Sequence, residues 1–323
     1  MEHVPAIDWA FAASTGRALV HPGPHLDAQA IAAVVTELRD AAARATYHVA
    51  EVTALERPTP SEVLVVDRAS WVNAVCGSAR AMLADAGAAE PDSPLAAVRA
   101  RGLGAQAGTV FAVVASRILG QFDPFADPAR LLLVAPNIVT AERQLRARPS
   151  DFRLWVCLHE ETHRFQFGHA PWLREHLLGL LRELLSGEEL RFGWPQAGRP
   201  ASVRDLITNP VQREAFDQVT AVMSLMEGHA DVMMDRVGTA VVPSYASIRQ
   251  GFEARRDQQG WGAWVRRLLG FDLKREQYRD GAGFCRQVIE AGGVQTLNRA
   301  FEAPGLLPTL HEIHDPQLWL HRV

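Results

Sequence analysis

Cysteine is scarce in this chain, and a long apolar run is missing. The three cysteines, Cys76, Cys157 and Cys285, are odd in number and far apart. This spacing excludes a zinc knuckle and a disulfide framework, and it favours buried, reduced thiols. No segment approaches the roughly 20 apolar residues that span a bilayer, so we expect no membrane partner. The first residues, MEHVPAIDWAFAAS, include early acidic residues and no apolar signal sequence, so we expect a cytoplasmic location.

An excess of charge of one sign is also lacking. Lysine and arginine together number 33, against 37 aspartates and glutamates, which gives a net charge of -4 at pH 7. The pairs Arg255-Arg256 and Arg266-Arg267 are too short to form a basic tract and are typical of solvated helix faces. We therefore expect no nucleic acid as a partner.

Signatures of several other enzyme classes are absent. The chain has no G-x-S-x-G pattern, which the nucleophile of an α/β-hydrolase requires. A carboxylate-bridged di-iron centre needs two Glu-x-x-His pairs, and only Glu160 and His163 form one. Gly102, Gly104 and Gly108 miss the dinucleotide-binding pattern by one residue and follow an Ala-rich helical stretch, so they indicate close contact between helices.

The rest of the chain predicts a mainly helical α+β fold. We expect one domain over residues 1–323, with a helical portion in 1–110 and the chemistry in 111–323. Apolar spacing of three and four predicts helices over 27–52, 67–87, 93–119, 171–185 and 210–237, the last ended by Gly238. The run Leu131 to Ala135 is the best strand candidate. Ser150 or Asp151 is expected to cap a helix that passes His163 and ends near Gly168.

Residues 159 to 163 form the pattern H-E-x-x-H, which on a helix is typical of zinc hydrolases. Residues four apart lie on the same face of a helix, so His159 and His163 can bind one metal ion from adjacent turns. Glu160 would project beside the metal. From there its carboxylate can take a proton from a water molecule that zinc has acidified to a pKa of about 7. The pattern predicts His159 and His163 as zinc ligands and Glu160 as the catalytic base.

The residues around this pattern decide between a metal site and a surface helix with two incidental histidines. The flanking positions are strongly apolar: Leu154, Trp155, Val156, Leu158, Phe165 and Phe167. Such a helix is expected to be buried, and buried imidazoles need polar partners. The context therefore favours the metal site. Histidine and carboxylate ligands suit several divalent ions, of which zinc is preferred here.

A catalytic zinc site needs a third protein ligand, and the segment EGHAD supplies candidates. Glu227 and Asp231 are four residues apart, so they share one helix face. Glu227 would bind the metal, while Asp231 would accept the spare N–H of a ligand histidine, in the first place His159. Gly228 would let the two helices approach closely. His229 is the alternative ligand, although it points about 200° around the helix from Glu227.

Several further segments carry a resemblance to a known family. The order H-E-x-x-H, then glutamate, then aspartate four residues later resembles the gluzincin branch of zinc metallopeptidases. More specifically, the chain resembles the zincin-like metallopeptidase type 2 family. That family was formerly a domain of unknown function, and its actinobacterial members are often labelled as associated with deazaflavin-coenzyme biosynthesis. The segments are LGQFDPF (119–125), LLLVAPNI (131–138), FRLWVCLHEETHRFQF (152–167), APWLREHL (170–177), EGHADVMMD (227–235) and LPTLHEIHDPQLWLHRV (307–323).

The resemblance implies a zincin-like fold with a small sheet and one helix that carries both histidines. The matching ligand positions are His159, His163 and Glu227. The resemblance also implies that LLLVAPNI is an edge strand near the cleft, to which an extended peptide could add. It implies no substrate, and no residue pattern in the chain indicates a deazaflavin pocket.

We therefore expect a zinc-dependent hydrolase that cleaves an amide, in a peptide or in a small molecule. The alternative is a non-catalytic interaction protein that metal binding stabilises. A donor for the oxyanion of the tetrahedral intermediate is also required. Residue type alone offers five candidates, which sequence reasoning leaves unranked: Tyr245, Tyr278, Arg249, His311 and His314.

Overall fold

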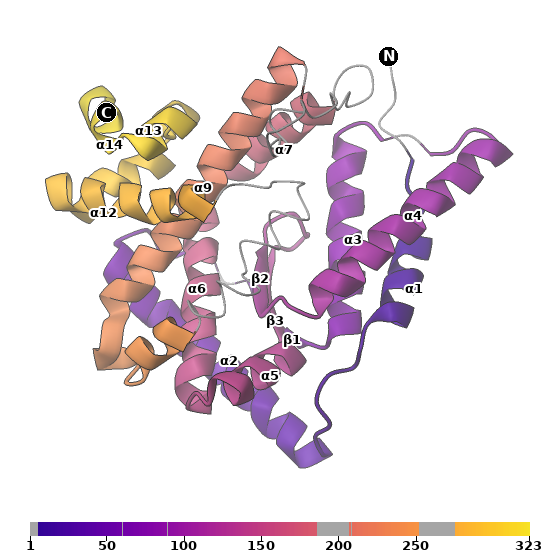
Figure 1. The fold of residues 1–323 in the computed structure, drawn as a ribbon, viewed down its shortest axis with the longest axis horizontal. Coiled ribbons are helices and arrows are strands. Elements are labelled where there is room, and N and C mark those ends of the chain that lie inside the picture. Colours follow the sequence, from indigo (N-terminus) through magenta and orange to yellow (C-terminus); the bar gives the residue numbers. More distant parts are fainter. Residues whose placement is uncertain (1–5, 60, 89, 186–206, 208, 252–274) are drawn as a thin grey trace, which may run out of the picture.

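Helices dominate the computed structural model of the chain, which describes residues 6–59, 61–88, 90–185, 207, 209–251 and 275–323 (Figure 1). The long helices are α1 (Trp9–Leu19), α2 (Ala28–Thr53), α3 (Arg68–Asp85), α4 (Pro94–Ala115), α5 (Ala135–Leu145), α6 (Pro149–His169), α7 (Trp172–Leu185), α9 (Pro210–Val241) and α12 (Arg275–Asn298). The C-terminal part adds η1 (Arg299–Phe301), η2 (Pro304–Leu306), α13 (Leu310–His314) and α14 (Pro316–Arg322). The predicted helices agree with these bounds to within a few residues. No helix in the described residues is long and apolar enough to cross a membrane.

A small sheet of three strands lies between the helices. Its strands are β1 (Glu62–Val66), β2 (Gly120–Asp123) and β3 (Arg130–Val134), in the order β1-β3-β2. β3 pairs in parallel with β1 and antiparallel with β2. The strand prediction for Leu131 to Ala135 is confirmed apart from its last residue, which begins α5.

The implied edge position of LLLVAPNI is wrong, because β3 is the central strand and has a neighbour on each side. An uninterrupted apolar run is typical of a strand that is covered on both faces, which is the environment of a central strand. The strand that lies at an edge beside α6 is β2, from the LGQFDPF segment.

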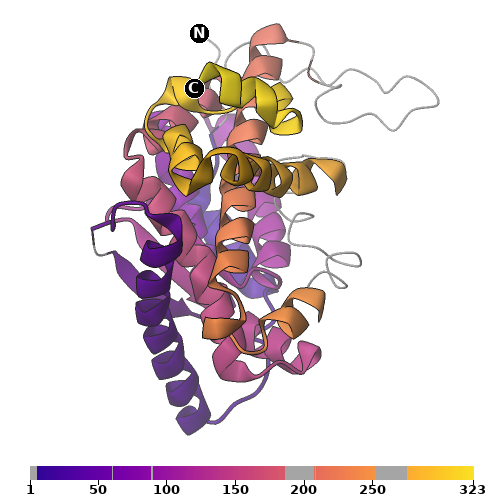
Figure 2. The same cartoon turned by 90° about the vertical axis from the view of Figure 1, so that its left-hand side faces the viewer.

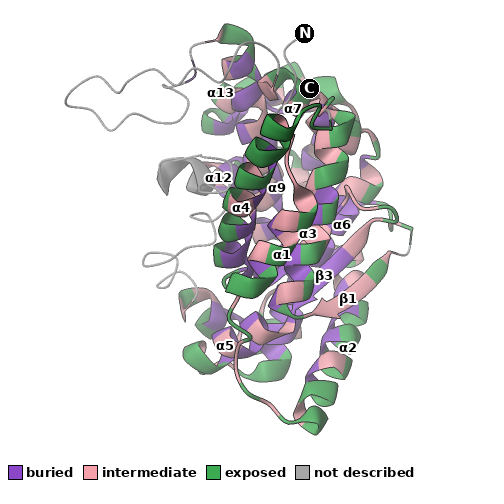
Figure 3. Ribbon diagram, turned by 90° about the vertical axis from the view of Figure 1, so that its right-hand side faces the viewer, coloured by how far each residue is buried: buried purple, intermediate pink, exposed green. Residues whose placement is uncertain are grey.

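The side chains of β3 alternate between two hydrophobic layers. Leu131 and Leu133 pack into the larger core, with α2, α6 and α9. Leu132 and Val134 pack into a second core, with α1, α3 and α4. Figure 3 shows α1, α3 and α4 over one face of the sheet, with the buried strand β3 behind them. The sheet therefore separates the two cores, and α6 lies on the side of the larger one.

The structure explains the glycines between Gly102 and Gly108. A Cβ on Gly108 would clash with the backbone of Ala12 in α1, and one on Gly104 with the backbone of Asp8, the N-cap of α1. The predicted helix contact is thus confirmed for these two glycines, whereas a Cβ on Gly102 would meet no other atom within 4 Å. All three cysteines are free and buried, as the sequence predicts.

Helix α6 begins earlier than the sequence suggests. Pro149 occupies its first turn, and Arg148 precedes it without a side-chain cap. Proline suits this position because its fixed φ matches the helix and its missing N–H is not needed there. The predicted cap at Ser150 or Asp151 is therefore wrong. The Asp151 carboxylate instead accepts hydrogen bonds from the backbone N–H and the hydroxyl of Ser244, at 3.0 and 2.8 Å.

Helix α9 crosses the molecule beside α6 and joins it to the C-terminal helices (Figure 2). Asn209 caps its first turn, and helical geometry breaks at Gly238 (φ 59°), the predicted end.

Gly228 allows a close approach, but to a different helix from the one expected. A Cβ there would clash with the backbone of Gly281 on α12. The glycine thus serves the α9–α12 contact and not the contact between α9 and α6.

Candidate metal centre

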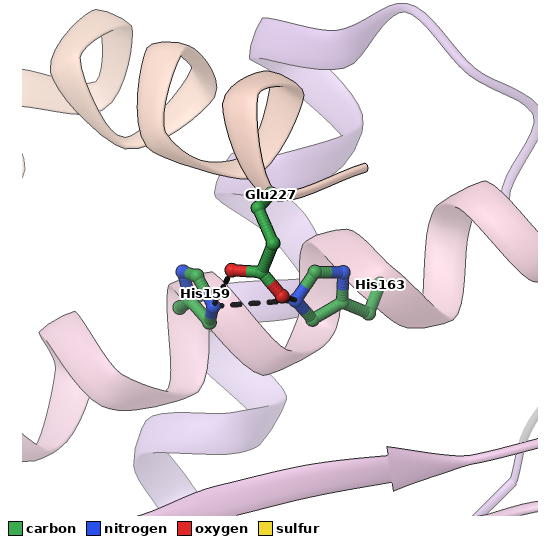
Figure 4. Close-up of side chains that lie close together, drawn as sticks. All are labelled: His159, His163 and Glu227. Atoms are coloured by element: carbon green, nitrogen blue, oxygen red, sulfur yellow. Dashed lines mark hydrogen bonds and ion pairs between the residues drawn. The ribbon is translucent and has the colours of Figure 1, made fainter. Parts of the chain in front are cut away.

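Two helices bring three potential ligands together. His159 and His163 project from one face of α6, and Glu227 reaches them from α9 (Figure 4). The Nε2 atoms of His159 and His163 are 3.2 Å apart. Each lies 3.5 Å from a different carboxylate oxygen of Glu227. Within the described residues, this is the one cluster of His, Cys, Asp and Glu side chains with the spacing of a metal site.

These separations fit the bond lengths and angles of a tetrahedral zinc site. Zinc–nitrogen and zinc–oxygen bonds of about 2.0–2.1 Å at tetrahedral angles place neighbouring ligand atoms roughly 3.3 Å apart. The measured separations of 3.2 and 3.5 Å lie close to that value. The three side chains are 11, 12 and 18% exposed, so the cluster is largely desolvated yet still reaches the surface. The donor set therefore fits a zinc ion with one position left for water or substrate.

The acidic groups around the two imidazoles favour the binding of a cation. Burial lowers the pKa of His159, but the hydrogen bond and charge of Glu227 and the charges of Glu160 and Asp231 outweigh this and raise it to about 9. Burial keeps the pKa of His163 below its usual value. A proton on His159 would balance part of the negative charge of these carboxylates. A divalent ion would replace that proton, as it does in metal sites generally.

Glu160 lies beside the cluster with an unsatisfied carboxylate oxygen. The residue is 2% exposed, and its Oε1 has no hydrogen-bond partner among the described residues. Burial raises its pKa to about 7, against the opposing effects of His159 and of a hydrogen bond from the backbone of Phe122. A carboxyl group with a pKa near neutrality can both accept and return a proton.

Strand β2 packs directly against Glu160. A Cβ on Gly120 would lie 2.7 Å from Cγ of Glu160 and 3.0 Å from its Oε1. Only glycine leaves room for the carboxylate at this point. Sequence reasoning missed the role of Gly120. The available signal was a glycine inside a strand-forming segment, which indicates close approach of another group.

We expect Gly120→Ala to move the Glu160 carboxylate and to lower kcat/KM. A displacement of about 1 Å in a catalytic group can cost on the order of a hundredfold in rate. Zinc content should stay at the wild-type level, because the three atoms nearest to such a Cβ all belong to Glu160 and none to a candidate ligand. Gly102→Ala is the matched control, since nothing lies within 4 Å of a Cβ there. Equal activity of the two variants would show that Gly120 does not position Glu160.

Asp231 lies one turn beyond Glu227 on α9. Its charge is close enough to raise the pKa of both His159 and His163. Its carboxylate also faces Arg249, with the Nη1–Oδ1 distance at 3.9 Å. This position suits the expected role of holding His159, which stays a prediction.

His229, the alternative ligand, lies outside the cluster. It is fully buried, and its Nδ1 is 3.0 Å from Nε2 of Gln166. Its ring lies edge-on to Phe301, with centroids 5.3 Å apart. Burial lowers its pKa to about 3, so it is neutral. Glu227 and His229 thus point in different directions, as their helical spacing requires.

Of the oxyanion candidates, two are engaged elsewhere. The Tyr245 hydroxyl donates to Asp235 at 2.5 Å and lies 3.5 Å from Arg249. His314 hydrogen-bonds the carbonyl of Leu310 and pairs with Asp280. His311 is exposed on α13. The side chain of Tyr278 lies outside the described residues. Arg249 pairs with Asp235 at 3.2 Å and also faces Asp231, which lies one turn beyond Glu227, at 3.9 Å.

The helical α+β fold and the His-His-Glu cluster define a zincin-like protein. A family model described as zincin-like metallopeptidase matches residues 7–320. This chain therefore belongs to the zincin-like metallopeptidase family. It is also similar to the crystal structure of a proposed hydrolase with a novel fold from Chloroflexus aurantiacus, with 30% identity over 98% of both chains and a TM-score of 0.75. A search of curated proteins gave no significant match. Family membership supports a metal-dependent hydrolase.

Proposed function

We propose that this protein is a zinc metallopeptidase, with His159, His163 and Glu227 as ligands and Glu160 as general base. One observation carries the proposal. The Nε2 atoms of His159 and His163 on α6 lie 3.2 Å apart, and each lies 3.5 Å from one carboxylate oxygen of Glu227 on α9, with the buried carboxylate of Glu160 beside them.

The residues of the candidate site have separate roles in amide hydrolysis. When bound, zinc supplies Lewis-acid activation of water and of the scissile carbonyl. Glu160 takes a proton from the attacking water and delivers it to the leaving nitrogen. Its raised pKa suits both transfers. Asp231 would hold His159 through the ring N–H that faces away from the metal, which fixes the orientation of that ligand.

The number of ligands favours an enzyme over a metal-stabilised interaction protein. Structural zinc sites usually have four protein ligands, whereas catalytic sites have three and keep one position open. In the described residues the cluster holds three. Its side chains are also partly exposed, so substrate can reach the metal position.

The position of β2 at an edge of the described sheet supports an extended peptide as substrate. The carbonyl of Leu119 accepts from the N–H of Val134, so Gly120 and Phe122 direct their own polar groups away from β3. The hydrogen bond from Phe122 to Glu160 orients this edge toward the candidate site. A peptide added to β2 would pass Glu160 and the metal position. This assigns to β2 the role that the sequence resemblance implied for β3.

A peptide library and a set of single-residue amides, each incubated with zinc-loaded protein, test the proposal. We expect cleavage of peptides of several residues, loss of cleavage with a chelator and recovery when zinc is added back. An extended peptide gains backbone hydrogen bonds along β2 that a small amide cannot make. Preferential cleavage of the small amides would favour a small-amide hydrolase. No cleavage of any compound by protein with one zinc per chain would support the non-catalytic alternative.

A further inference from the structure

A buried chain of hydrogen bonds leads from His163 away from the ligand cluster. The Nδ1 atom of His163 lies 2.9 Å from Oε1 of Gln166, three residues further along α6. The Nε2 atom of Gln166 lies 2.9 Å from the carbonyl oxygen of Met226 and 3.0 Å from Nδ1 of His229. Gln166 and His229 are both 0% exposed, so water does not compete for these bonds.

The carbonyl of Met226 fixes the direction of every bond in this chain. A backbone carbonyl only accepts hydrogen bonds, so the NH2 group of Gln166 must face Met226. The amide oxygen of Gln166 then faces His163 and must accept a hydrogen from Nδ1. His163 consequently carries its proton on Nδ1 and presents the Nε2 lone pair to the cluster. This is the tautomer that a metal ligand binding through Nε2 needs.

His229 takes the second hydrogen of the same NH2 group. Since Gln166 donates, Nδ1 of His229 accepts, and the proton of that ring lies on Nε2. That Nε2 has no hydrogen-bond partner among the described residues. A buried N–H without a hydrogen-bond partner is energetically unfavourable. The hydrogen bond from Gln166 to Nδ1 of His229 therefore forms even though it leaves the Nε2–H of His229 without a partner.

We propose that Gln166 and His229 are positioning residues that lock His163 in the tautomer able to bind a metal ion through Nε2. The lock also links the two helices of the site, since Met226 immediately precedes Glu227 on α9. The inference rests on the proposed metal site. It adds that the orienting partner of His163 is a neutral amide, held in place by a second, non-ligand histidine.

Three variants test this lock: Gln166→Met, His229→Leu and His229→Asn. Methionine keeps the shape of glutamine without its amide. Asparagine can place an acceptor where Nδ1 of histidine lies, whereas leucine of similar size cannot. We expect Gln166→Met to weaken zinc binding about 10–100-fold, the range for loss of a partner that orients a ligand. His229→Leu should weaken binding in the same direction, and His229→Asn should stay within about threefold of wild type.

The second readout is the tautomer of His163 in metal-free protein, from long-range 1H–15N spectra of histidine-labelled samples. Wild type should show the Nδ1–H form, and Gln166→Met should lose it. Gln212→Met is the matched control, because Gln212 is also a buried glutamine that donates to a backbone carbonyl, Leu184, at 3.1 Å. It should lower Tm without changing zinc affinity.

The outcomes separate this inference from the proposed function. If wild type binds zinc and Gln166→Met matches it in both affinity and tautomer, the lock is refuted while the metallopeptidase proposal stands. If wild type binds no zinc, the proposed function fails, and the spectra of metal-free protein alone decide the lock. Equal zinc affinity of His229→Leu and His229→Asn would remove His229 from the proposal.

Discussion

Replacing Glu160 with glutamine should leave zinc bound and lower kcat/KM by at least about a hundredfold, the lower end of what general acid–base catalysis contributes. Glutamine has nearly the shape of glutamate, so the packing against Gly120 on β2 is preserved. It cannot accept the proton of the attacking water. Elemental analysis should give one zinc per chain in both proteins, and steady-state kinetics on a cleaved library peptide should show the loss.

Glu161→Gln provides the control one residue along the same helix. Glu161 is also fully buried, but it pairs with Arg164, with Oε2 and Nη2 2.6 Å apart. Glu161→Gln should lower Tm, because the buried guanidinium of Arg164 is then poorly paired. The rate of hydrolysis should stay near the wild-type value. If Glu160→Gln retained full activity, or if both variants lost activity equally, Glu160 would not be the base.

The features that depend on local spacing could be predicted from the sequence. The four-residue interval between His159 and His163 fixes their common face on any helix, and the apolar flanks require that helix to be buried. The angle of about 200° between Glu227 and His229 requires them to face different groups. Helical periodicity alone could not say which of these two faces the histidines, because that depends on how α9 rotates against α6.

Features that depend on packing between distant segments could not be predicted in the same way. The run at Leu131 reads as a strand from its composition, but its place in the middle of the sheet depends on β1 and β2, which lie far away in sequence or have weak strand signals. Gly228 signals a close approach, yet its partner Gly281 lies on a helix far along the chain. Gln166 carries no signal as a single residue, since its role requires Met226 and His229 from another helix.

Removing a ligand should have the other large effect. His163→Ala should weaken zinc binding by more than about a hundredfold, beyond the range for loss of an outer partner. Two ligand atoms, from His159 and Glu227, would remain where three converge in the wild type. Equilibrium titration with a competing chelator measures the affinity, and elemental analysis after gel filtration should find zinc in the wild type and little in the variant.

The same loss should be visible in thermal stability. A ligand that binds only the folded chain stabilises it by about 2.7 kcal/mol at 100 times its Kd, so zinc should raise the Tm of the wild type by several degrees. The Tm of His163→Ala should not respond to that zinc concentration.

His169→Ala is the control: this histidine is on the same helix, but its ring lies against the backbone of Glu56, outside the ligand cluster. The His169 variant should keep the zinc-induced rise. If His163→Ala also kept it, with one zinc per chain, then α6 and α9 would not hold the metal at their crossing, and any zinc in the protein would have to be bound elsewhere.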